Sequence, residues 1–202
     1  MAKIAYPVSP IDPFLGRNLR FGRGETNDAV VIALSELRCV AYGAQRATGG
    51  CERIMQIFAI LVLGLMCGSE LNVGAFAHPA SNHQSLQVHI PVRAALAAKL
   101  GRVMPFWMAG STLLNLLLLL PFVGLSGLSW RLAAISFAIQ IGAVAFSLIG
   151  PVPINNRIMK WTSENLPADW KEQESRWNSY HLGRTNALIS AFGLLICSLA
   201  VR

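Results

Sequence analysis

The sequence has few charged residues. Asp, Glu, Lys and Arg make up 13% of its 202 residues, whereas 53% are hydrophobic and the mean hydropathy is +0.47. Soluble domains carry roughly a quarter charged residues, so this composition favours a membrane protein. The net charge of +7 comes without a dense Lys/Arg stripe or a nucleic-acid-binding motif. We therefore expect no nucleic-acid partner, and membrane lipid is the better partner for the basic residues.

Several chemical signatures are also absent from the sequence. The four cysteines lack metal-ligand spacing and imply no disulfide framework. No Ser-His-Asp order, phosphate loop or dinucleotide fingerprint appears. The first fifty residues lack an apolar stretch followed by a small-residue cleavage site, so we expect no secretory signal there.

Four apolar runs approach the length that a helix needs to cross a bilayer, which is roughly 20 residues. They are 54–77, 103–125, 132–150 and 185–201, and we expect the helix of the last run to begin within the polar segment before it. The sequence therefore predicts an all-α, multi-pass integral membrane protein, in the plasma membrane if it is bacterial. Residues 51–202 are expected to form a four-helix transmembrane bundle, and residues 1–50 an amphipathic or disordered N-terminal extension.

Glu70 is the only formal charge between residues 54 and 77. A carboxylate in hydrocarbon costs on the order of 2 to 3 kcal/mol or more unless it is paired, protonated or hydrated, so it indicates an internal polar site. Met66, Gly74 and His78 share its four-residue spacing and therefore its helix face. Gly74 leaves space for a ligand or a neighbouring helix. Pro79 is expected to end the helix and to place His78 near a membrane interface.

Polar residues also follow the third run and precede the fourth. Pro151 and Pro153 interrupt the third run, and Asn155 and Asn156 suit either capping of freed carbonyls or a polar ligand. Before the fourth run, a helix is expected to begin at Asp169 in a capping box with Glu172. One face of that helix then carries, at steps of three or four, Trp170, Glu174, Trp177, His181, Arg184 and Leu188.

Purely structural roles would explain some of these residues. Trp161, Trp170 and Trp177 suit an interfacial aromatic belt. Arg93 and Arg102 suit anchoring to lipid headgroups by long side chains that reach the interface.

If the bundle closes, Glu70, Asn155 or Asn156, His181 and Arg184 meet in one pocket. A structural Glu70–Arg184 ion pair is an alternative that explains two of these residues. In the functional interpretation, a histidine or a buried glutamate acts as a general base. Arg184 and the amides then stabilise an oxyanion.

A metal site of Glu70, His78 and His181 is a further alternative. No His-x-x-His or Glu-x-x-His pair indicates it, so no metal or other cofactor is assigned, although a metal is not excluded.

Three pieces of the sequence resemble the anthrone oxygenase-like membrane proteins. They are GSELNVGAFAHPA at the end of the first run, PINNRI after the third, and LPADWKEQESRWNSYHLGRT before the fourth. The resemblance extends from about residue 54 to the C-terminus and implies a four-helix membrane fold. Family members with an assigned role are anthrone or noranthrone oxidases of polyketide pathways. They use O2 to convert an anthrone methylene to a quinone carbonyl.

The resemblance implies a cofactor-independent monooxygenase that acts on a polycyclic phenol. Deprotonation of an anthrone gives an electron-rich anion that reacts with O2 directly. The base would be Glu70 or His181, and Arg184 would stabilise the anion. The residues expected to bind the substrate are Asn155 and Asn156 as hydrogen-bond donors, Trp177 as a stacking partner, and His78, which would orient Glu70 or only cap the helix.

Two non-enzymatic interpretations stay open at this point. One is a small-molecule binder or transporter with Glu70 as its proton-coupled site. The other is a membrane scaffold whose polar residues only tie helices together. A homo-oligomer is compatible with all of these interpretations.

Overall fold

The computed structural model describes residue 50 and residues 52–201, and these residues are helical apart from short connections. The chain divides into two units, Met1–Gly43 and Ala44–Arg202, and all described residues belong to the second. Apart from Gly50, the predicted N-terminal extension lies outside the described residues.

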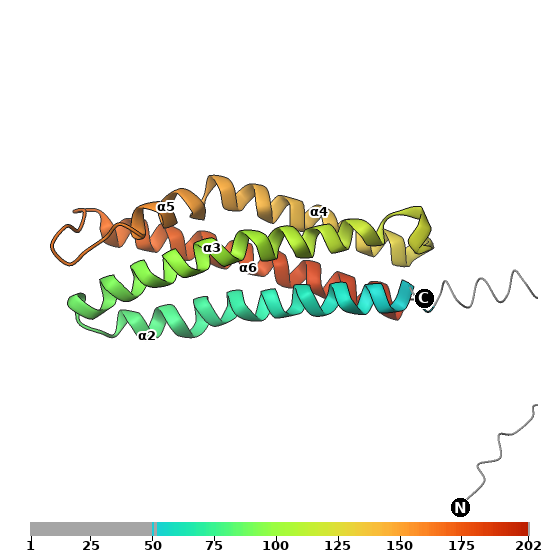
Figure 1. Ribbon diagram of the computed structural model, residues 1–202, viewed down its shortest axis with the longest axis horizontal. Helices are drawn as coiled ribbons and strands as arrows, with labels where there is room; N and C mark the ends of the chain where they lie inside the picture. Colours follow the sequence, from blue (N-terminus) through green and yellow to red (C-terminus); the bar gives the residue numbers. More distant parts are fainter. Residues whose placement is uncertain (1–49, 51, 202) are drawn as a thin grey trace, which may run out of the picture. The chain divides into compact units, whose positions relative to one another are not determined.

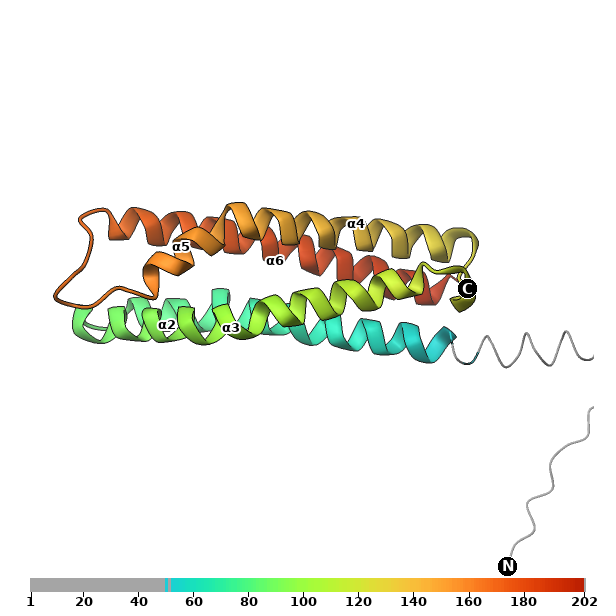
Figure 2. The same cartoon turned by 45° about the horizontal axis from the view of Figure 1, so that its top comes forward.

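Four long helical segments run alongside one another in both views (Figures 1 and 2). Figure 1 shows α2, α5 and the start of α6 at one end of this bundle and the α3–α4 turn at the other. The segments are the helix Glu52–Asn82, which includes η2 (Val73–Ala77) and α2 (His78–Asn82), followed by α3 (Leu86–Leu118), α4 (Gly127–Ile149) with the short α5 (Pro151–Ile158), and α6 (Trp170–Ala200).

Three of these helices are long and apolar enough to cross a membrane: Glu52–Asn82, Gly127–Ile149 and Trp170–Ala200. They support the prediction of a multi-pass membrane protein, and α6 begins before residue 185 as expected. The predicted span 103–125 differs from the helix observed there. The first half of α3 carries Lys99 and Arg102, and the helix already ends at Leu118. The chain then turns through η3 (Pro121–Val123) and Gly124, whose φ of 87° is readily adopted by glycine.

The prediction that Pro79 ends the first helix is wrong. Residues Val73–Ala77 form a π-helical turn in which the His78 N–H donates to the Val73 carbonyl, and α2 then continues to Asn82. Pro79 lies in the first turn of α2, where its missing N–H costs no helical hydrogen bond. His78 is therefore 6% exposed inside the bundle, instead of lying at a helix end near the interface.

The predicted break after the third run is confirmed. Helix α4 ends at Ile149, Gly150 has non-helical dihedral angles, and Pro151 is the first residue of α5. A Cβ atom on Gly150 would lie 3.2 Å from Tyr180 of α6, so the glycine permits a close approach of the two segments. Helix α5 is thereby directed away from the axis of α4, as Figure 2 shows.

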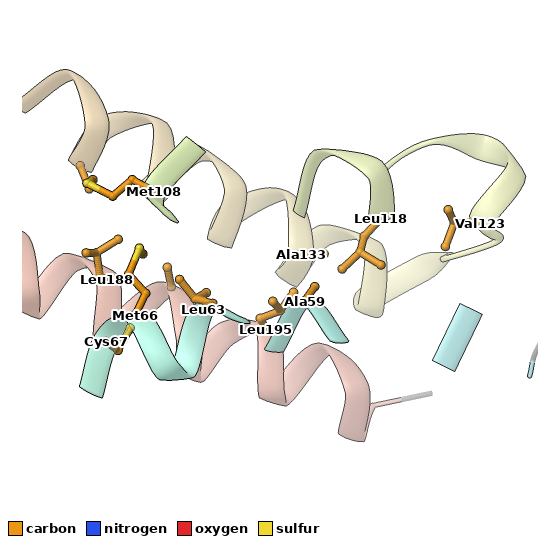
Figure 3. Close-up of a cluster of buried hydrophobic side chains, with 12 residues drawn as sticks. Ala59, Leu63, Met66, Cys67, Met108, Leu118, Val123, Ala133, Leu188 and Leu195 are labelled. Carbon is orange, nitrogen blue, oxygen red and sulfur yellow. The ribbon is translucent and has the colours of Figure 1, made fainter. Parts of the chain in front are cut away.

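The end of the bundle near the α3–α4 turn has a packed apolar core. Figure 3 shows buried side chains from several helices pointing toward one another, among them Leu63, Leu118 and Leu195. Large apolar side chains such as Phe106 and Ile149 face outward, more than 80% exposed, as suits contact with lipid. Because lipid is as apolar as leucine, side-chain packing holds such a core together within a membrane.

Hydrogen bonds between uncharged side chains tie the helices in this half of the bundle. Gln56 Nε2 donates to Ser198 Oγ at 2.6 Å, and Ser129 Oγ donates to the Ser198 carbonyl at 2.7 Å. Asn115 Nδ2 donates to Ser136 Oγ at 3.0 Å. These contacts satisfy buried polar groups where water is scarce.

Candidate functional site

A cavity of about 440 Å³ lies among α3, α4, α5 and α6 and reaches Glu70 of the first helix. This volume falls within the range of roughly 300 to 1,000 Å³ that is typical of small-molecule sites. Apolar residues, chiefly leucine, methionine and valine, form most of its wall. The wall also includes every residue that the sequence predicted for the site: Glu70, His78, Asn155, Asn156, Trp177, His181 and Arg184.

Glu70 is 2% exposed and belongs to a compact charged network. Arg184 Nη2 donates to Glu70 Oε2 at 2.6 Å, and His181 Nδ1 lies 3.2 Å from the same oxygen. The guanidinium compensates the charge of a carboxylate that hydrocarbon would otherwise disfavour. The other oxygen, Oε1, has no hydrogen-bond partner among the described residues. Glu70 therefore keeps one oxygen for a bound molecule.

The contacts of His181 fix the role of each ring nitrogen. Its Nε2 lies 3.0 Å from the Glu70 backbone carbonyl, which only accepts hydrogen bonds, so Nε2 carries a proton. In the neutral ring Nδ1 is then the acceptor, and it lies 3.2 Å from Arg184 Nη2. Nδ1 is thus the atom of this ring that gains or loses a proton.

Gly74 provides the space for this arrangement. A Cβ atom at Gly74 would lie 3.1 Å from both Cδ2 and Nε2 of His181. The sequence left open whether a ligand or a neighbouring helix fills the space beside Gly74. The structure places α6 there, through His181.

Trp177 is 7% exposed and packs against the His181 ring. The two rings stack with centroids 4.7 Å apart and an interplanar angle of 11°, and His78 meets the indole edge-on at 4.6 Å. The expected aromatic belt is therefore wrong for Trp177 and also for Trp161, which is 5% exposed. Both pack in a second apolar cluster with Ile154 and Ile158, so they do not face the membrane interface.

Trp177 also contacts a second charged cluster, formed by Arg93, His89 and Glu174. Arg93 Nε and His89 Nε2 lie 2.9 Å and 3.1 Å from the same oxygen, Glu174 Oε1, and His89 Nδ1 lies 2.9 Å from Ser81 Oγ. The Arg93 guanidinium carbon lies 5.0 Å from the centroid of the Trp177 ring. The expectation that Arg93 reaches lipid headgroups is wrong, because this side chain is 2% exposed and paired inside the bundle.

The two asparagines of α5 differ in their surroundings. Asn155 Nδ2 donates to the Ala97 carbonyl at 3.1 Å and so ties α5 to α3. Asn156 lines the same cavity and is exposed, which leaves its amide accessible to a ligand.

A family profile described as anthrone oxygenase matches residues 92–194. The chain belongs to the anthrone oxygenase family. The matched segment includes Arg93, both asparagines of α5, Trp177, His181 and Arg184, whereas Glu70 and His78 precede it. No curated protein and no solved structure matches the chain.

The candidate site contains residues that sequence reasoning missed. Arg93, His89 and Glu174 were not assigned to the site, although Glu174 was placed on the correct face of α6. The sequence does indicate that Glu174 needs a cationic partner, because it lies on the same helix face as Trp177 and is buried if that face is buried. Which cation pairs with it depends on the packing of α3 against α6, and the spacing of residues does not reveal that packing.

Two remaining expectations concern a metal and the start of α6. Within the part of the chain that the structure describes, no group of three His, Cys, Asp or Glu side chains is arranged to hold a metal ion. The alternative ligand set of Glu70, His78 and His181 therefore does not form one. Helix α6 does begin after Asp169, but the predicted capping box is wrong. Gln173 Nε2 donates to Asp169 Oδ1 at 2.9 Å, and Glu172 pairs with Arg176 at 2.6 Å.

Proposed function

We propose that this protein is a membrane oxygenase that uses O2 to oxidise the methylene carbon of an anthrone-type substrate to a carbonyl. The observation that carries the proposal is the Glu70–His181–Arg184 network in the wall of a mostly apolar cavity. Membership of the anthrone oxygenase family supports the substrate class and the use of O2. Such a substrate and O2 both dissolve in the bilayer, and three helices of the described residues are long and apolar enough to cross one.

The first step is removal of a proton from the methylene carbon. Glu70 takes the proton at Oε1, its only oxygen without a hydrogen-bond partner among the described residues. The negative charge moves from Glu70 to the substrate, so the net charge of the cavity does not change. General-base catalysis of this kind contributes typically about 10²–10⁴-fold to a rate. His181 Nδ1 lies 3.2 Å from the other oxygen, Oε2, so it receives the proton after the Glu70 carboxyl group has turned to exchange its two oxygens.

The resulting enolate then reacts with O2. It gives one electron to O2, the two radicals combine through a new C–O bond, and the peroxide anion takes back the proton. The base then removes the second methylene hydrogen as a proton while the O–O bond breaks. The products are the carbonyl and hydroxide, which takes that proton and leaves as water. One methylene group and one O2 thus give one carbonyl group and one water.

The other residues of the site position these groups. Arg184 holds both Glu70 and His181, and Trp177 fixes the ring of His181 by stacking. Asn156 is the better donor to a substrate oxygen, because the amide of Asn155 already donates to Ala97. His78 packs edge-on against Trp177 and closes this part of the wall.

Oxygen consumption by the purified protein in detergent, with an anthrone such as emodin anthrone as substrate, tests the proposal. Anthrones oxidise slowly without catalyst, so only differences between proteins count. Glu70→Gln and His181→Ala should each lower turnover by about 100-fold or more. The matched controls Glu172→Gln and His83→Ala change exposed residues and should keep the wild-type rate.

Equal rates for the wild type and the two site variants would refute the oxygenase. A metal assay on the same samples accompanies the measurement. Stoichiometric metal that is lost in the Glu70→Gln variant would contradict the cofactor-independent route.

A further inference from the structure

We infer that Arg93 forms an oxyanion subsite of the cavity, separate from the Glu70 network, which binds a negatively charged oxygen on an aromatic ligand. The inference rests on the proposed function for the class of ligand. Its structural basis is independent of that function, because it lies in the contacts of Arg93 and its neighbours.

Arg93 has hydrogen-bond donors to spare. It lines the cavity and is 2% exposed, and its ion-pair contact among the described residues places Nε 2.9 Å from Glu174 Oε1 without hydrogen-bond geometry. Neither Nη1 nor Nη2 has a hydrogen-bond acceptor among the described residues. Buried donors without partners are unfavourable, and a guanidinium fork matches an anionic oxygen or a carboxylate. A ligand oxygen at this position would satisfy both nitrogens.

The position of Arg93 is fixed by three residues outside the cavity wall and by Trp177, which lines the wall. Glu174 holds Nε, His89 shares the same carboxylate oxygen at 3.1 Å, and Ser81 holds His89. The Trp177 ring supports the guanidinium at 5.0 Å. Donors held in this way need no rearrangement when charge develops on a ligand, which is the condition for effective oxyanion stabilisation.

Arg184 is less suited to this role, although the sequence indicated it as the anion stabiliser. Its Nη2 lies 2.6 Å from Glu70 Oε2 and 3.2 Å from His181 Nδ1, so it serves the base. In an anthrone the carbonyl oxygen lies across the central ring from the methylene carbon, and the charge left by deprotonation moves to that oxygen. The base and the oxyanion donor must therefore be different groups.

Glu70 and Arg93 line the same cavity. Trp177 lies between them in the network of contacts, 4.7 Å from the His181 ring and 5.0 Å from the Arg93 guanidinium carbon. Fused rings that present a C–H group to Glu70 can therefore direct an oxygen toward Arg93.

Binding of two unreactive anthracenes tests the subsite. Anthracene-9-carboxylate carries an anionic group and 9-methylanthracene does not, and the fluorescence of each reports binding to the purified protein. The wild type should prefer the carboxylate. Arg93→Met should weaken carboxylate binding by at least about tenfold, the effect of losing a charged hydrogen bond. Binding of 9-methylanthracene should change by less than about threefold, because its apolar contacts remain.

Arg93→Lys and Arg176→Met complete the series. Lysine keeps the charge without the fork and should retain part of the preference for the carboxylate. It also provides the test if Arg93→Met does not yield folded protein by gel filtration. Arg176 is an exposed arginine of α6 with a side chain that is 64% exposed, and its replacement should leave both affinities unchanged.

Several outcomes would overturn the inference. They are a wild type with no preference for the carboxylate, an equal loss of both ligands in Arg93→Met, and unchanged binding in that variant. Displacement of the carboxylate by phosphatidylglycerol would assign the subsite to a lipid headgroup instead. An Arg93-dependent preference without oxygen consumption would uphold the subsite and refute the proposed oxygenase. Oxygen consumption without that preference would refute the subsite and uphold the proposed oxygenase.

Discussion

The two ends of this helical bundle solve the problem of buried polarity differently. Near the α3–α4 turn, Gln56, Ser129 and Ser198 bond to one another between packed leucines, and Glu52 is a buried carboxylate there. At the other end, two carboxylates and two guanidiniums are buried beside a cavity. The cavity end thus buries paired charges, whereas the other end relies mainly on hydrogen bonds between neutral groups. The proposed ligand chemistry would account for the paired charges, and substitutions at either end test this comparison.

The largest effect is expected from breaking one charge pair at the cavity end. Arg184→Met removes the partner of Glu70 and leaves a carboxylate that is 2% exposed without compensation. We expect a loss of about 3–5 kcal/mol in the free energy of unfolding, measured by thermal or denaturant unfolding in detergent. The double variant Glu70→Met/Arg184→Met should recover most of this stability and remain inactive. Equal destabilisation of the single and double variants would contradict the ion-pair explanation.

A smaller loss of stability, without a loss of turnover, is expected from a substitution at the apolar end. Leu195→Ala removes a side chain that is 0% exposed in the packed core. Its unfolding free energy should fall by about 2–4 kcal/mol because a cavity replaces the side chain. Turnover per folded molecule should stay near the wild-type value. A loss of turnover comparable to that of Glu70→Gln would mean that the apolar end contributes to activity as well as to stability.

Gly74→Ala sharpens the comparison within the cavity end itself. The added Cβ would lie 3.1 Å from His181 Cδ2 and Nε2, so the imidazole must shift by a few tenths of an ångström. We expect turnover to fall by about tenfold, because misplacement of catalytic groups is costly. Gly68→Ala is the control, since a Cβ at Gly68 meets nothing within 4 Å. If both variants keep full turnover, the position of His181 is not critical.

The smallest effect is expected from Ser129→Ala. It removes the hydrogen bond from Ser129 Oγ to the Ser198 carbonyl, 2.7 Å long, at the apolar end. Hydrogen bonds between membrane helices contribute on average about 0.6 kcal/mol, so unfolding should shift slightly and turnover should not change. A loss above about 2 kcal/mol would show that the neutral ties are as important as the buried charges.

The sequence predicted those features that depend on composition and local spacing. Three of the four apolar runs lie almost entirely within helices that are long and apolar enough to cross a membrane, and Glu70 lies in the wall of the cavity. The face of α6 was also readable, because Glu174, Trp177, His181 and Leu188 are buried as their spacing indicated. The Glu70–Arg184 pair was among the alternatives, and it is present at 2.6 Å.

Features that depend on contacts between distant segments were not predictable in this way. Arg93 beside an interface and Arg93 paired with Glu174 have the same local sequence, and only the packing of α3 against α6 decides between them. The same holds for Trp161 and Trp177, whose burial follows from the position of α5. The helix continues past Pro79 through the π turn. This turn was not predictable, because it depends on backbone hydrogen bonds that composition does not specify.

The π turn of Val73–Ala77 determines which residues of the first helix share a face, in a way that hydropathy does not reveal. A π turn contains one more residue per hydrogen-bonded ring than an α turn, so it accommodates one extra residue without rotating the helix that follows. If the same residues closed as ordinary α-helix, His78 and everything after it would rotate by about 100° relative to Glu70, the angle of one α-helical residue. The apolar profile and the three spans would be unchanged, yet His78 would no longer face Trp177.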